Sequence, residues 1–503
     1  MALHLYNTLS RSLEPFEPQE PGHARIYVCG MTTYDLCHIG HARAMMAFDV
    51  AVRYLRFADY KVTYVRNYTD VDDKIIARAA ELGEPPLALA KRYCDALDQD
   101  MAALGLVEPD HSPKVSEHIP GIVAMTASLV EKGNAYAAES GDVYFAVDSF
   151  DRYGKLSGKK LDDLRAGERV AVDPNKRNPA DFALWKSAKQ GEVSWESPWG
   201  QGRPGWHIEC SVMSSHHLGE SFDIHGGGID LIFPHHENEI AQSECAHGNH
   251  PMAKYWLHNG HLSVVERDET GEWQQVKMSK SLGNVINIRD VVADMPAEAL
   301  RWVYVRTHYR SPLPYSSEAL QDAMGVLARL YEAKERAQEI ANSAADSDPS
   351  KLAKESAKAG ELYKLLANFK VAFHEAMDQD LNTALASSLV LDVVRTINRV
   401  STDKVTKRRG AGLMRNALQV FEISAEVLGI GGMEPAEFFA ELREKQARVQ
   451  GLDVAWVESQ LQARLDARAA KDWAAADAIR DALLEKRIVI MDSPSGVTWR
   501  IQV

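Results

Sequence analysis

The chain of 503 residues is long enough for about three or four domains, because a domain usually spans about 100 to 200 residues. Its composition, with 45% hydrophobic, 8% aromatic and 25% charged residues, is typical of globular proteins and excludes a disordered or collagen-like chain. The formal net charge of −14 argues against unselective nucleic-acid binding, since the mean field of the protein repels phosphate.

The sequence also favours a cytoplasmic protein without membrane contact. Its first residues lack the basic segment and the apolar run of a signal peptide, and no stretch reaches the roughly 18 consecutive apolar residues of a membrane span. The five scattered cysteines favour free thiols in a reducing compartment over a disulfide framework. These are Cys29, Cys37, Cys94, Cys210 and Cys245.

The first part of the chain has the pattern of a parallel strand–helix–strand unit. Arg25–Cys29 is a short β-rich segment that ends at Gly30, and Ala42–Phe57 then carries apolar residues at helical spacing. Lys61–Tyr68 alternates like a second strand, and a helical pattern follows from Asp72. A nucleotide pocket is expected where the first strand of such a unit ends.

A segment at 117–202 interrupts this pattern and predicts an insertion between two halves of one sheet. It contains a helix, a short strand at Asp142–Val147 and a stretch rich in Gly, Pro and Trp. Ser221–His225 then predicts a further strand. We expect a turn after it at Gly226–Gly228 and the next helix at Pro234–Ala246.

Beyond residue 315 the periodicity is helical almost throughout, which predicts a helical bundle. A polar segment at 341–360 and a basic loop at 401–412 interrupt it, and two short strands are expected at Ile488–Met491 and Val497–Ile501. The predicted domains are two catalytic halves at 1–116 and 203–260 around the insertion at 117–202, a linker fold at 261–315, a bundle at 316–440 and a small C-terminal domain at 441–503.

A short motif, His38-Ile39-Gly40-His41, lies where the first strand turns into its helix. Imidazoles three residues apart share a helix face, and a helix N-terminus offers N–H groups and a positive dipole, so the motif suits polyphosphate. Gly40 would let a flat base approach the backbone. Histidines that only cap the helix or face solvent remain an alternative.

A second motif, Lys277-Met278-Ser279-Lys280-Ser281, lies between a strand-like segment and a helix. Two ammonium groups on such a loop would neutralise the charge that develops on a pyrophosphate leaving group. Taken alone, the pair is equally well explained as two solvated lysines.

Together, the motifs are the HIGH and KMSKS signatures, and the chain resembles a class I aminoacyl-tRNA synthetase. Within this class it is similar to the cysteinyl-tRNA synthetases from residue 3 to the C-terminus. The resemblance is carried by YVCGMTTYD, NYTDVDDKI, KRNPADFALWK, SPWGQGRPGWHIECSVMSSHHLG, FDIHGGGIDLIFPHHENEIAQSE and KMSKSLGN.

The resemblance implies a fold and a reaction. The fold would be α/β, with a class I Rossmann-like parallel-sheet catalytic domain that carries an insertion, then an α-helical bundle and a small mixed α/β C-terminal domain. The chain, expected to be a monomer, would activate L-cysteine with ATP and Mg²⁺ and transfer it to the 3′-terminal adenosine of tRNA-Cys. His38, His41, Lys277 and Lys280 would stabilise charge in the first step.

Cys29, Cys210, His235 and Glu239 are candidate metal ligands. His235 and Glu239 lie four residues apart and so face one way on the expected helix, whereas the two cysteines lie far apart in the sequence. From spacing alone, a buried thiol or a helix-face His–Glu pair explains each residue equally well. The resemblance implies one zinc ion per chain on these four side chains, which would distinguish the thiol of cysteine from the hydroxyl of serine.

Two further sets of residues are expected in the nucleotide and amino-acid pockets. Glycines after the strand Ser221–His225 would let an adenosine lie against the backbone, while a carboxylate binds the ribose hydroxyls. A tight turn with a helix cap, or core packing, is the alternative. By resemblance, the ATP-binding residues are Gly40, Gly226, Gly227, Gly228, Asp230 and Lys280, and the amino-acid-binding residues are Thr69, Trp206 and His225.

The C-terminal segment is similar to the anticodon-binding domain of the family. The resemblance implies that Lys471, Arg480, Trp499 and Arg500 contact phosphates or stack on unpaired anticodon bases, although such residues are also common at a surface or in a core. Arg487 stands where relatives usually carry Gly, and the segment reads TWRI rather than TWRR, so the contacts there depart from the family pattern.

Three other functions fit parts of the sequence. A metalloprotease motif, His-Glu-x-x-His, is excluded because its second histidine falls on Ile240. A cysteine ligase of low-molecular-weight thiol biosynthesis would use the same adenylate, but such relatives lack the C-terminal domain. A non-catalytic, zinc-bearing RNA-binding relative is disfavoured by the intact HIGH and KMSKS motifs.

Overall fold

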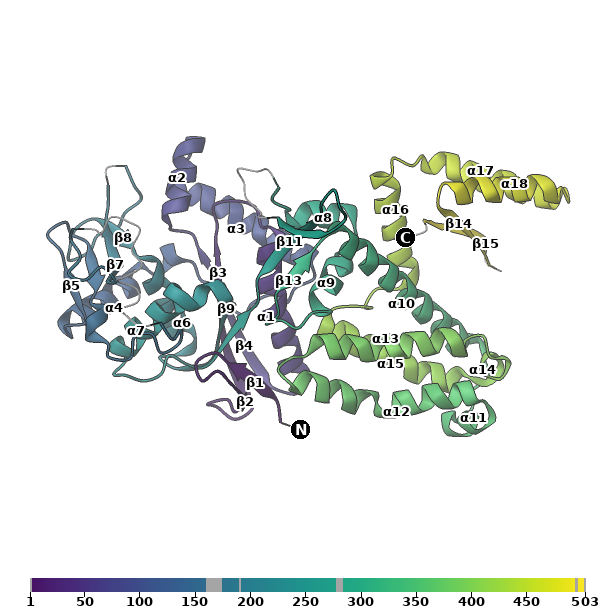
Figure 1. The fold of residues 1–503 in the computed structure, drawn as a ribbon, viewed down its shortest axis with the longest axis horizontal. Coiled ribbons are helices and arrows are strands. Elements are labelled where there is room, and N and C mark those ends of the chain that lie inside the picture. The colour runs from purple at the N-terminus through teal and green to yellow at the C-terminus, as the bar shows by residue number, and fades with distance from the viewer. Residues whose placement is uncertain (1, 160–173, 190, 277–283, 494–495, 502–503) are drawn as a thin grey trace.

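The computed structural model describes residues 2–159, 174–189, 191–276, 284–493 and 496–501 (Figure 1). An α/β region forms one end of an elongated molecule, a helical bundle forms the other, and a small C-terminal unit lies beside the bundle. None of the helices in the described residues combines the length and the apolar character that a membrane span requires.

A four-stranded parallel sheet forms the centre of the α/β region, in the order β10-β9-β3-β4. Its strands are β3 (His23–Thr32), β4 (Lys61–Thr69), β9 (Phe222–Gly228) and β10 (Ala253–Asn259). Helix α1 (Ile39–Phe57) connects β3 to β4, so the predicted strand–helix–strand unit and the α/β class are confirmed. Because β3 and β9 are neighbours, segments from both sides of the insertion meet in one sheet.

A second, antiparallel sheet forms in the chain between these two halves. Its strands, in sheet order, are β5 (Ala135–Ala137), β6 (Val143–Phe145), β7 (Phe182–Ser187) and β8 (Gly202–Pro204). The helices in this part of the chain are α2 (Asp73–Leu82), α3 (Pro86–Ala103), α4 (Ile119–Glu131) and α6 (Trp206–Leu218), of which α4 and α6 pack on the sheet. The strand expected at Asp142–Val147 is therefore present as the shorter β6.

The turn expected at Gly226–Gly228 is wrong. These glycines are the last residues of β9 and pair with Leu257–Asn259 of β10. A Cβ atom on Gly226 would lie 2.2 Å from the ring of Phe48, so close packing against α1 explains this glycine.

The helix expected from Pro234 begins only at Glu237, as α7 (Glu237–Ala246). Two short helical segments, Ile229–Leu231 and Ile232–His236, occupy the interval after β9. Phe233 has extended backbone angles, φ −141° and ψ 132°, which interrupt a regular helix there. His235 therefore precedes α7 instead of lying on it.

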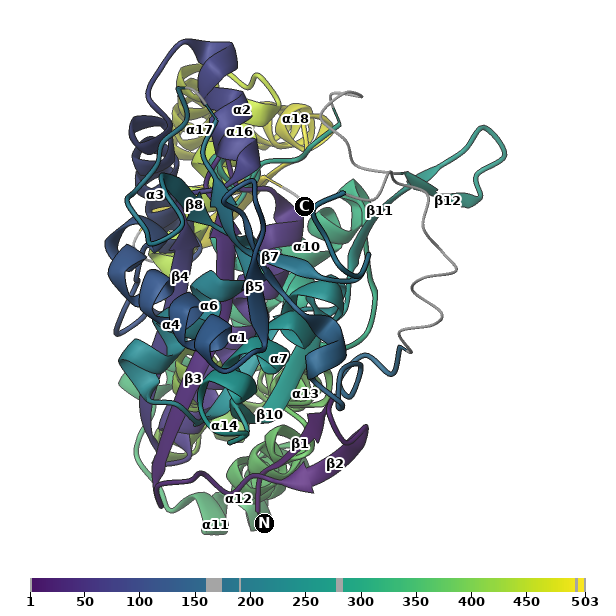
Figure 2. The same ribbon diagram turned by 90° about the vertical axis from the view of Figure 1, so that its left-hand side faces the viewer.

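A three-stranded sheet in the order β12-β11-β13 and two helices follow β10. These elements are β11 (Leu262–Arg267), β12 (Trp273–Val276), α8 (Ile288–Asp294), α9 (Ala297–Val305) and β13 (Leu313–Tyr315). The hairpin of β11 and β12 projects from the body of the molecule (Figure 2). The predicted catalytic residues Lys277 and Lys280 follow β12 and lie outside the described residues.

Helices form the bundle, as expected. Its long members are α10 (Ser317–Ser343), α12 (Ala357–Asp378), α13 (Thr383–Val400) and α15 (Ala411–Leu428). The polar segment at 341–360 contains a short helix, α11 (Pro349–Glu355). The expectation of a loop at 401–412 is wrong, because Lys404–Arg409 form α14, whose N-terminus is capped by the Asp403 carboxylate on the Thr406 N–H.

The C-terminal unit has a small core of its own. Its elements are α16 (Pro435–Val449), α17 (Val454–Ala469), α18 (Trp473–Glu485), β14 (Ile488–Ser493) and β15 (Gly496–Ile501). β14 and β15 form an antiparallel hairpin, which confirms the two strands expected there. Its buried apolar side chains are Ala447, Val457, Leu461, Leu483, Ile488, Trp499 and Ile501.

Two arginine side chains contribute to the contacts that the bundle makes with the α/β region and with the C-terminal unit. Arg301 of α9 lies 2.6 Å from Asp49 of α1, and the two side chains are only 2% and 1% exposed. Arg301 also donates to the Leu428 carbonyl at the end of α15. Arg500 of β15 instead pairs with Glu335 of α10 at 2.8 Å in a partly exposed contact.

An N-terminal hairpin was not predicted. It consists of β1 (His4–Asn7) and β2 (Ser12–Pro15), which are too short for a clear alternation of polar and apolar residues. The Tyr6 N–H donates to Asp380 of the bundle and the Asn7 amide oxygen accepts from Trp256 of β10, so the hairpin links two regions.

Candidate functional site

The four predicted metal ligands lie together near the carboxyl end of β3. Cys29 is on β3, Cys210 on α6, His235 in the segment before α7 and Glu239 on α7. The two Sγ atoms are 3.7 Å apart, and His235 Nε2 lies 3.6 Å from Cys210 Sγ. Glu239 Oε1 lies 3.5 Å from Cys29 Sγ and 2.8 Å from His235 Nε2. Folding thus joins buried residues that sequence spacing could not connect.

The separations between the two sulfur atoms, and between Cys210 Sγ and His235 Nε2, suit a tetrahedral cation. Metal–ligand distances of about 2.3 Å for sulfur and about 2.0 Å for nitrogen separate two sulfur ligands by about 3.8 Å, and sulfur from nitrogen by about 3.5 Å. The observed 3.7 Å and 3.6 Å agree with these values. Two thiols, an imidazole and a carboxylate are also a donor set that zinc accepts.

Burial and mutual contacts set the charges of this cluster. A hydrogen bond from Cys29 lowers the pKa of Cys210 to about 6, whereas burial raises the pKa of Cys29 well above its usual value. Burial opposes the charged form of His235, but Glu239 raises its pKa to about 10. Burial likewise opposes ionisation of Glu239, yet His225 and His235 hold its pKa well below its usual value. The cluster therefore carries an excess of negative charge, which favours a cation.

His225, on β9, contacts two members of the cluster. Its Nε2 is 3.0 Å from Glu239 Oε2 and 3.7 Å from Cys29 Sγ, and its ring stacks on Tyr27. Cys29, His225, His236 and Glu239 form a second group whose ligand atoms lie within 4.8 Å of one another. His225 was predicted to line the amino-acid pocket, but its observed contacts orient the carboxylate of Glu239.

His207 is a residue of this site that the sequence analysis missed. Its Nδ1 lies 3.0 Å from His235 Nδ1, and the indole of the adjacent Trp206 stacks on the His235 ring with centroids 4.3 Å apart. Burial holds the pKa of His207 well below its usual value, so the ring is neutral. The only signal in the sequence was its place beside Trp206 in the motif GWHIEC.

A cavity of about 460 Å³ opens beside the cluster, at the carboxyl ends of β3, β4 and β9. Predicted ATP, amino-acid and metal residues line it together: Cys29, His38, Gly40, His41, Thr69, Trp206, Cys210, Gly228, Asp230 and His235. The described lining does not include Gly226, Gly227, His225 or Glu239. It does include Tyr34, Lys74, Asn259 and His261, which were not predicted.

The HIGH motif forms the N-terminus of α1. His38 is the N-cap residue, and its Nδ1 accepts a hydrogen bond of 3.1 Å from the Gly40 N–H. The rings of His38 and His41 stack with centroids 3.6 Å apart, so the imidazoles lie face to face and do not sit side by side along the helix. Both line the cavity where the helix dipole favours an anion.

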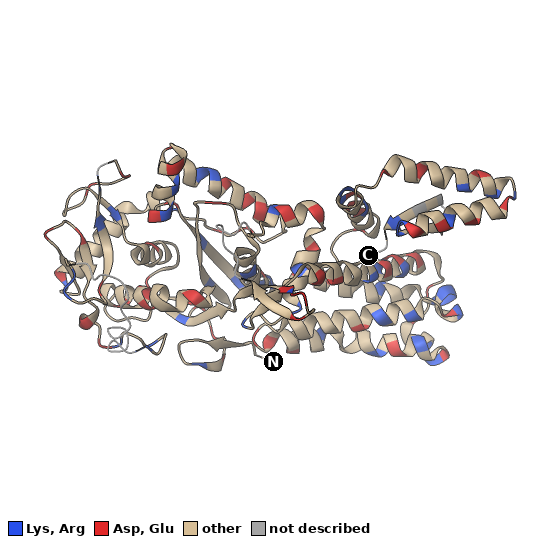
Figure 3. Ribbon diagram, turned by 45° about the horizontal axis from the view of Figure 1, so that its top comes forward, with Lys and Arg blue, Asp and Glu red and all other residues tan. Residues whose placement is uncertain are grey.

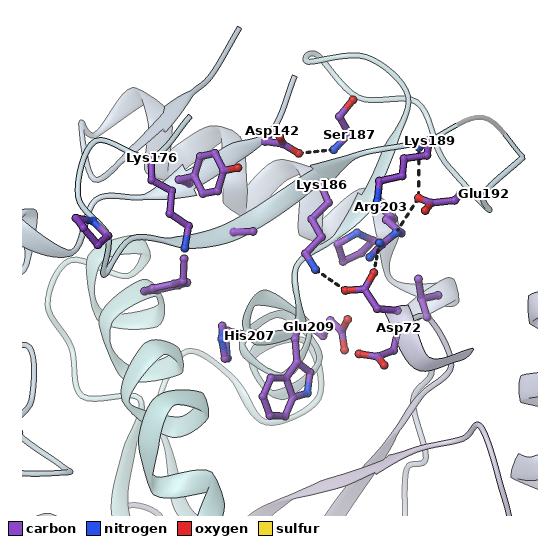
Figure 4. Close-up of a pocket in the computed structure, with 18 residues that line it drawn as sticks. Asp72, Asp142, Lys176, Lys186, Ser187, Lys189, Glu192, Arg203, His207 and Glu209 are labelled. Carbon is purple, nitrogen blue, oxygen red and sulfur yellow. Dashed lines mark hydrogen bonds and ion pairs between the residues drawn. The ribbon is translucent and has the colours of Figure 1, made fainter. Parts of the chain in front are cut away.

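A second cavity, of about 740 Å³, shares Trp206 with the first (Figure 4). Two of its basic side chains are paired, since Lys186 Nζ lies 2.7 Å from Asp73 and Arg203 contacts the same carboxylate. Burial raises the pKa of Glu209 in its wall, and one Glu209 oxygen has no hydrogen-bond partner among the described residues. This cavity is polar but has no marked excess of positive charge.

The four predicted tRNA contacts have different surroundings in the C-terminal unit. Trp499 is 2% exposed and donates from Nε1 to Glu458, so its ring belongs to the core. Arg500 is paired with α10, and its guanidinium lies over the ring of Phe439. Of these four predicted residues, Lys471 and Arg480 are the two with exposed charged side chains. Their contact with RNA remains a prediction, as does that of the other two.

Acidic and basic residues alternate along α17 and α18 (Figure 3). Arg480 pairs with Asp477 at 2.9 Å and Asp481 at 3.0 Å on its own helix. Lys471 lies in the turn between the two helices with φ 61°. This unit is therefore not a uniformly basic surface.

Comparison with known proteins agrees with the fold and the site. Residues 15–325 match the family described as tRNA synthetases class I (C) catalytic domain, residues 372–431 the DALR domain and residues 455–500 the cysteinyl-tRNA ligase anticodon binding domain. The methionyl-tRNA synthetase of Mycobacterium tuberculosis, solved with methionyl-adenylate, is 15% identical with a TM-score of 0.59 and covers 86% of this chain and 94% of its own. The architecture is that of a class I aminoacyl-tRNA synthetase.

Curated relatives are similar over their full length. A cysteine–tRNA ligase of Alkalilimnicola ehrlichii is 48% identical, and one of Delftia acidovorans is 50% identical, with 99% of each chain covered in both cases. The chain belongs to the cysteine–tRNA ligase, or cysteinyl-tRNA synthetase, family. The resemblance inferred from the sequence motifs is confirmed.

Proposed function

We propose that the chain is a cysteine–tRNA ligase whose choice of amino acid depends on a zinc ion held by Cys29, Cys210, His235 and Glu239. The observation that carries the proposal is the gathering of these four buried side chains, whose ligand atoms lie within 4.8 Å of one another, beside the cavity that Cys29, Cys210, His235 and the HIGH motif line. Bound there, one zinc ion per chain would bind the thiol of cysteine as a thiolate, for which the harder hydroxyl of serine is a poor substitute.

In the first step, the carboxylate of cysteine attacks the α-phosphorus of ATP, and pyrophosphate leaves with the electron pair of the broken P–O bond. His38, His41 and the N-terminal dipole of α1 bind the phosphates, with Mg²⁺ expected on their oxygens. Lys277 and Lys280 stabilise the charge on the leaving pyrophosphate. The residues position and stabilise, so no side-chain nucleophile is required.

In the second step, a hydroxyl of the 3′-terminal adenosine of tRNA-Cys attacks the cysteinyl carbonyl and AMP leaves. Asp230 and Gly228 line the cavity at the end of β9, where they suit the ribose and adenine of the nucleotide. Thr69 and Trp206 line the part beside the metal cluster and suit the amino acid. The larger cavity beyond Trp206 offers room for the terminal nucleotide of the tRNA.

The alternative is a ligase that joins cysteine to an amino-sugar in thiol biosynthesis. Such an enzyme uses the same adenylate but has no anticodon-binding domain, and residues 455–500 match that domain. Charging of purified tRNA-Cys by the enzyme supports the ligase, whereas cysteine-dependent pyrophosphate exchange without charging favours the alternative. Cysteines that are all free thiols fit a cytoplasmic enzyme, and we propose that it acts there as a monomer.

The role of zinc is tested by Cys210→Ala. The variant should lose the ion, measured by metal analysis, because a ligand is missing. Its preference for cysteine over serine in pyrophosphate exchange should fall from about ten-thousandfold to about 10- to 200-fold, which is what a pocket without a thiol-specific contact achieves. Cys245→Ala, which removes a free thiol outside the cluster, should keep both the metal and the preference. Full preference in metal-free enzyme contradicts the proposal.

A further inference from the structure

Four histidines gather outside the catalytic cavity, at the C-terminal end of α6. His216 and His217 lie in the last turn of α6, about two helical turns beyond Cys210, and His118 lies directly before α4. His111 stacks on His217 with ring centroids 4.7 Å apart. The ring centroid of His118 lies 5.3 Å from that of His216 and 5.7 Å from that of His217. This group takes no part in the proposed reaction.

Three of these imidazoles are already placed for one ion. A ligand nitrogen of each of His118, His216 and His217 lies within 4.8 Å of the other two. A metal with ligand distances of about 2.0 Å would bring them to about 3.3 Å, so each has to move by about an ångström or less. His216 is exposed and the other two are half-buried, so small side-chain rotations suffice.

The hydrogen bonds of the cluster leave nitrogen lone pairs for a ligand. His118 Nδ1 lies 2.8 Å from the Lys114 carbonyl oxygen, which only accepts, so Nδ1 carries the proton and Nε2 the lone pair. A histidine that donates one ring N–H to a carbonyl is the usual arrangement at metal ligands. His217 Nε2 is buried and has no hydrogen-bond partner among the described residues, which is costly for a polar atom unless something binds it.

Burial also favours the neutral form of His217. Burial and the neighbouring imidazoles of His111, His216 and His118 lower the pKa of His217 to about 4. Neutral imidazoles suit late first-row transition metals, whereas Mg²⁺ and Ca²⁺ prefer oxygen ligands.

We propose that His118, His216 and His217 form a second metal site, for a divalent late first-row transition ion such as Zn²⁺ or Ni²⁺. The site joins the start of α4, the first helix of the inserted segment before the antiparallel sheet, to the end of α6, the helix that carries Cys210. Its role is to clamp these two helices, which already pack against each other. The proposal does not depend on the catalytic assignment.

The experiment titrates Ni²⁺ into full-length, untagged, zinc-loaded protein by isothermal titration calorimetry. The expected result is one additional equivalent of Ni²⁺ and a thermal unfolding midpoint that rises by a few degrees, because the ion binds only the folded chain. His216→Ala should weaken this binding by at least about tenfold. It alters an exposed side chain, so the protein should fold and keep its rate of cysteine-dependent pyrophosphate exchange.

His250→Ala is the matched control, because His250 is another exposed histidine of the α/β region that lies outside the cluster. It should bind Ni²⁺ as the unmodified chain does. His118→Gln should weaken binding as His216→Ala does, which tests the ligand from the other helix. Equal Ni²⁺ affinity in His216→Ala and His250→Ala, or no equivalent beyond the thiol-containing site, overturns the proposal while leaving the catalytic assignment intact.

Discussion

The catalytic cavity and the C-terminal unit place their polar residues in opposite ways. In the α/β region, Cys29, Cys210, His235 and Glu239 are buried against one another, although they come from distant segments. In the C-terminal unit, Arg480 is exposed and paired within its own helix. A buried polar group is costly without a partner, so the first arrangement is one that could hold a metal ion. The exposed ion pairs of the second arrangement do not by themselves point to a ligand.

The two regions are also attached differently to the bundle. The α/β region is joined to it through Arg301, whose pair with Asp49 is fully buried. The C-terminal unit is joined to it through Arg500, whose partner Glu335 is 40% exposed. Removing one partner of a buried pair leaves an uncompensated charge, whereas solvent screens an exposed pair. We therefore expect mutations to have large effects in the first region and small effects in the second.

The largest effect is expected at Lys280, which the sequence assigns to the catalytic loop. Lys280→Ala should lower the rate of cysteine-dependent pyrophosphate exchange by about a hundredfold to a thousandfold, because a charge that stabilises the transition state is lost. The affinity for cysteine should change little. Lys91→Ala, at an exposed position on α3, is the control and should keep its rate. An unchanged exchange rate in Lys280→Ala would refute the assigned role.

The next largest effect is expected on the free energy of unfolding, from the ion pairs that join the α/β region and the C-terminal unit to the bundle. Asp49→Asn should lower the free energy of unfolding by about 3 kcal/mol, since it leaves the buried Arg301 without its counter-charge. Glu335→Gln, at the exposed attachment, should cost less than about 1 kcal/mol. Urea unfolding of both variants measures these values. Equal losses would show that burial does not distinguish the two attachments.

The smallest effect is expected for the predicted RNA contacts. The double variant Lys471→Glu and Arg480→Glu should raise the KM for tRNA-Cys by about tenfold, because two cations near phosphate are reversed. The rate of pyrophosphate exchange without tRNA should not change. Lys354→Glu on α11 reverses a charge outside this unit and serves as the control. If both variants charge tRNA equally well, Lys471 and Arg480 do not contact RNA.

The sequence predicted those parts of the fold that depend on local patterns. The alternation in Lys61–Tyr68 identified β4, and two short segments of strand-forming residues identified β14 and β15. The turn predicted at Gly226–Gly228 was wrong. Glycine is common in turns, but it also allows the close approach of the Phe48 ring to a strand. The cap by Asp403 that starts α14 was likewise overlooked among basic residues.

The candidate site was predictable only in part from the residues themselves. His235 and Glu239 are four residues apart and could be paired from spacing, but Cys29 and Cys210 meet through the sheet order, which spacing does not contain. Their grouping came from the family resemblance. His207 was missed because its contact with His235 crosses two elements.

The most direct test of the account replaces zinc by Co²⁺ and records the visible absorption of the cobalt–thiolate centre. If the thiol of the substrate binds the metal, adding cysteine should change the position and intensity of the cobalt bands, and serine at the same concentration should not. An unchanged spectrum with cysteine, or the same change with serine, would contradict the claim that the metal selects the amino acid.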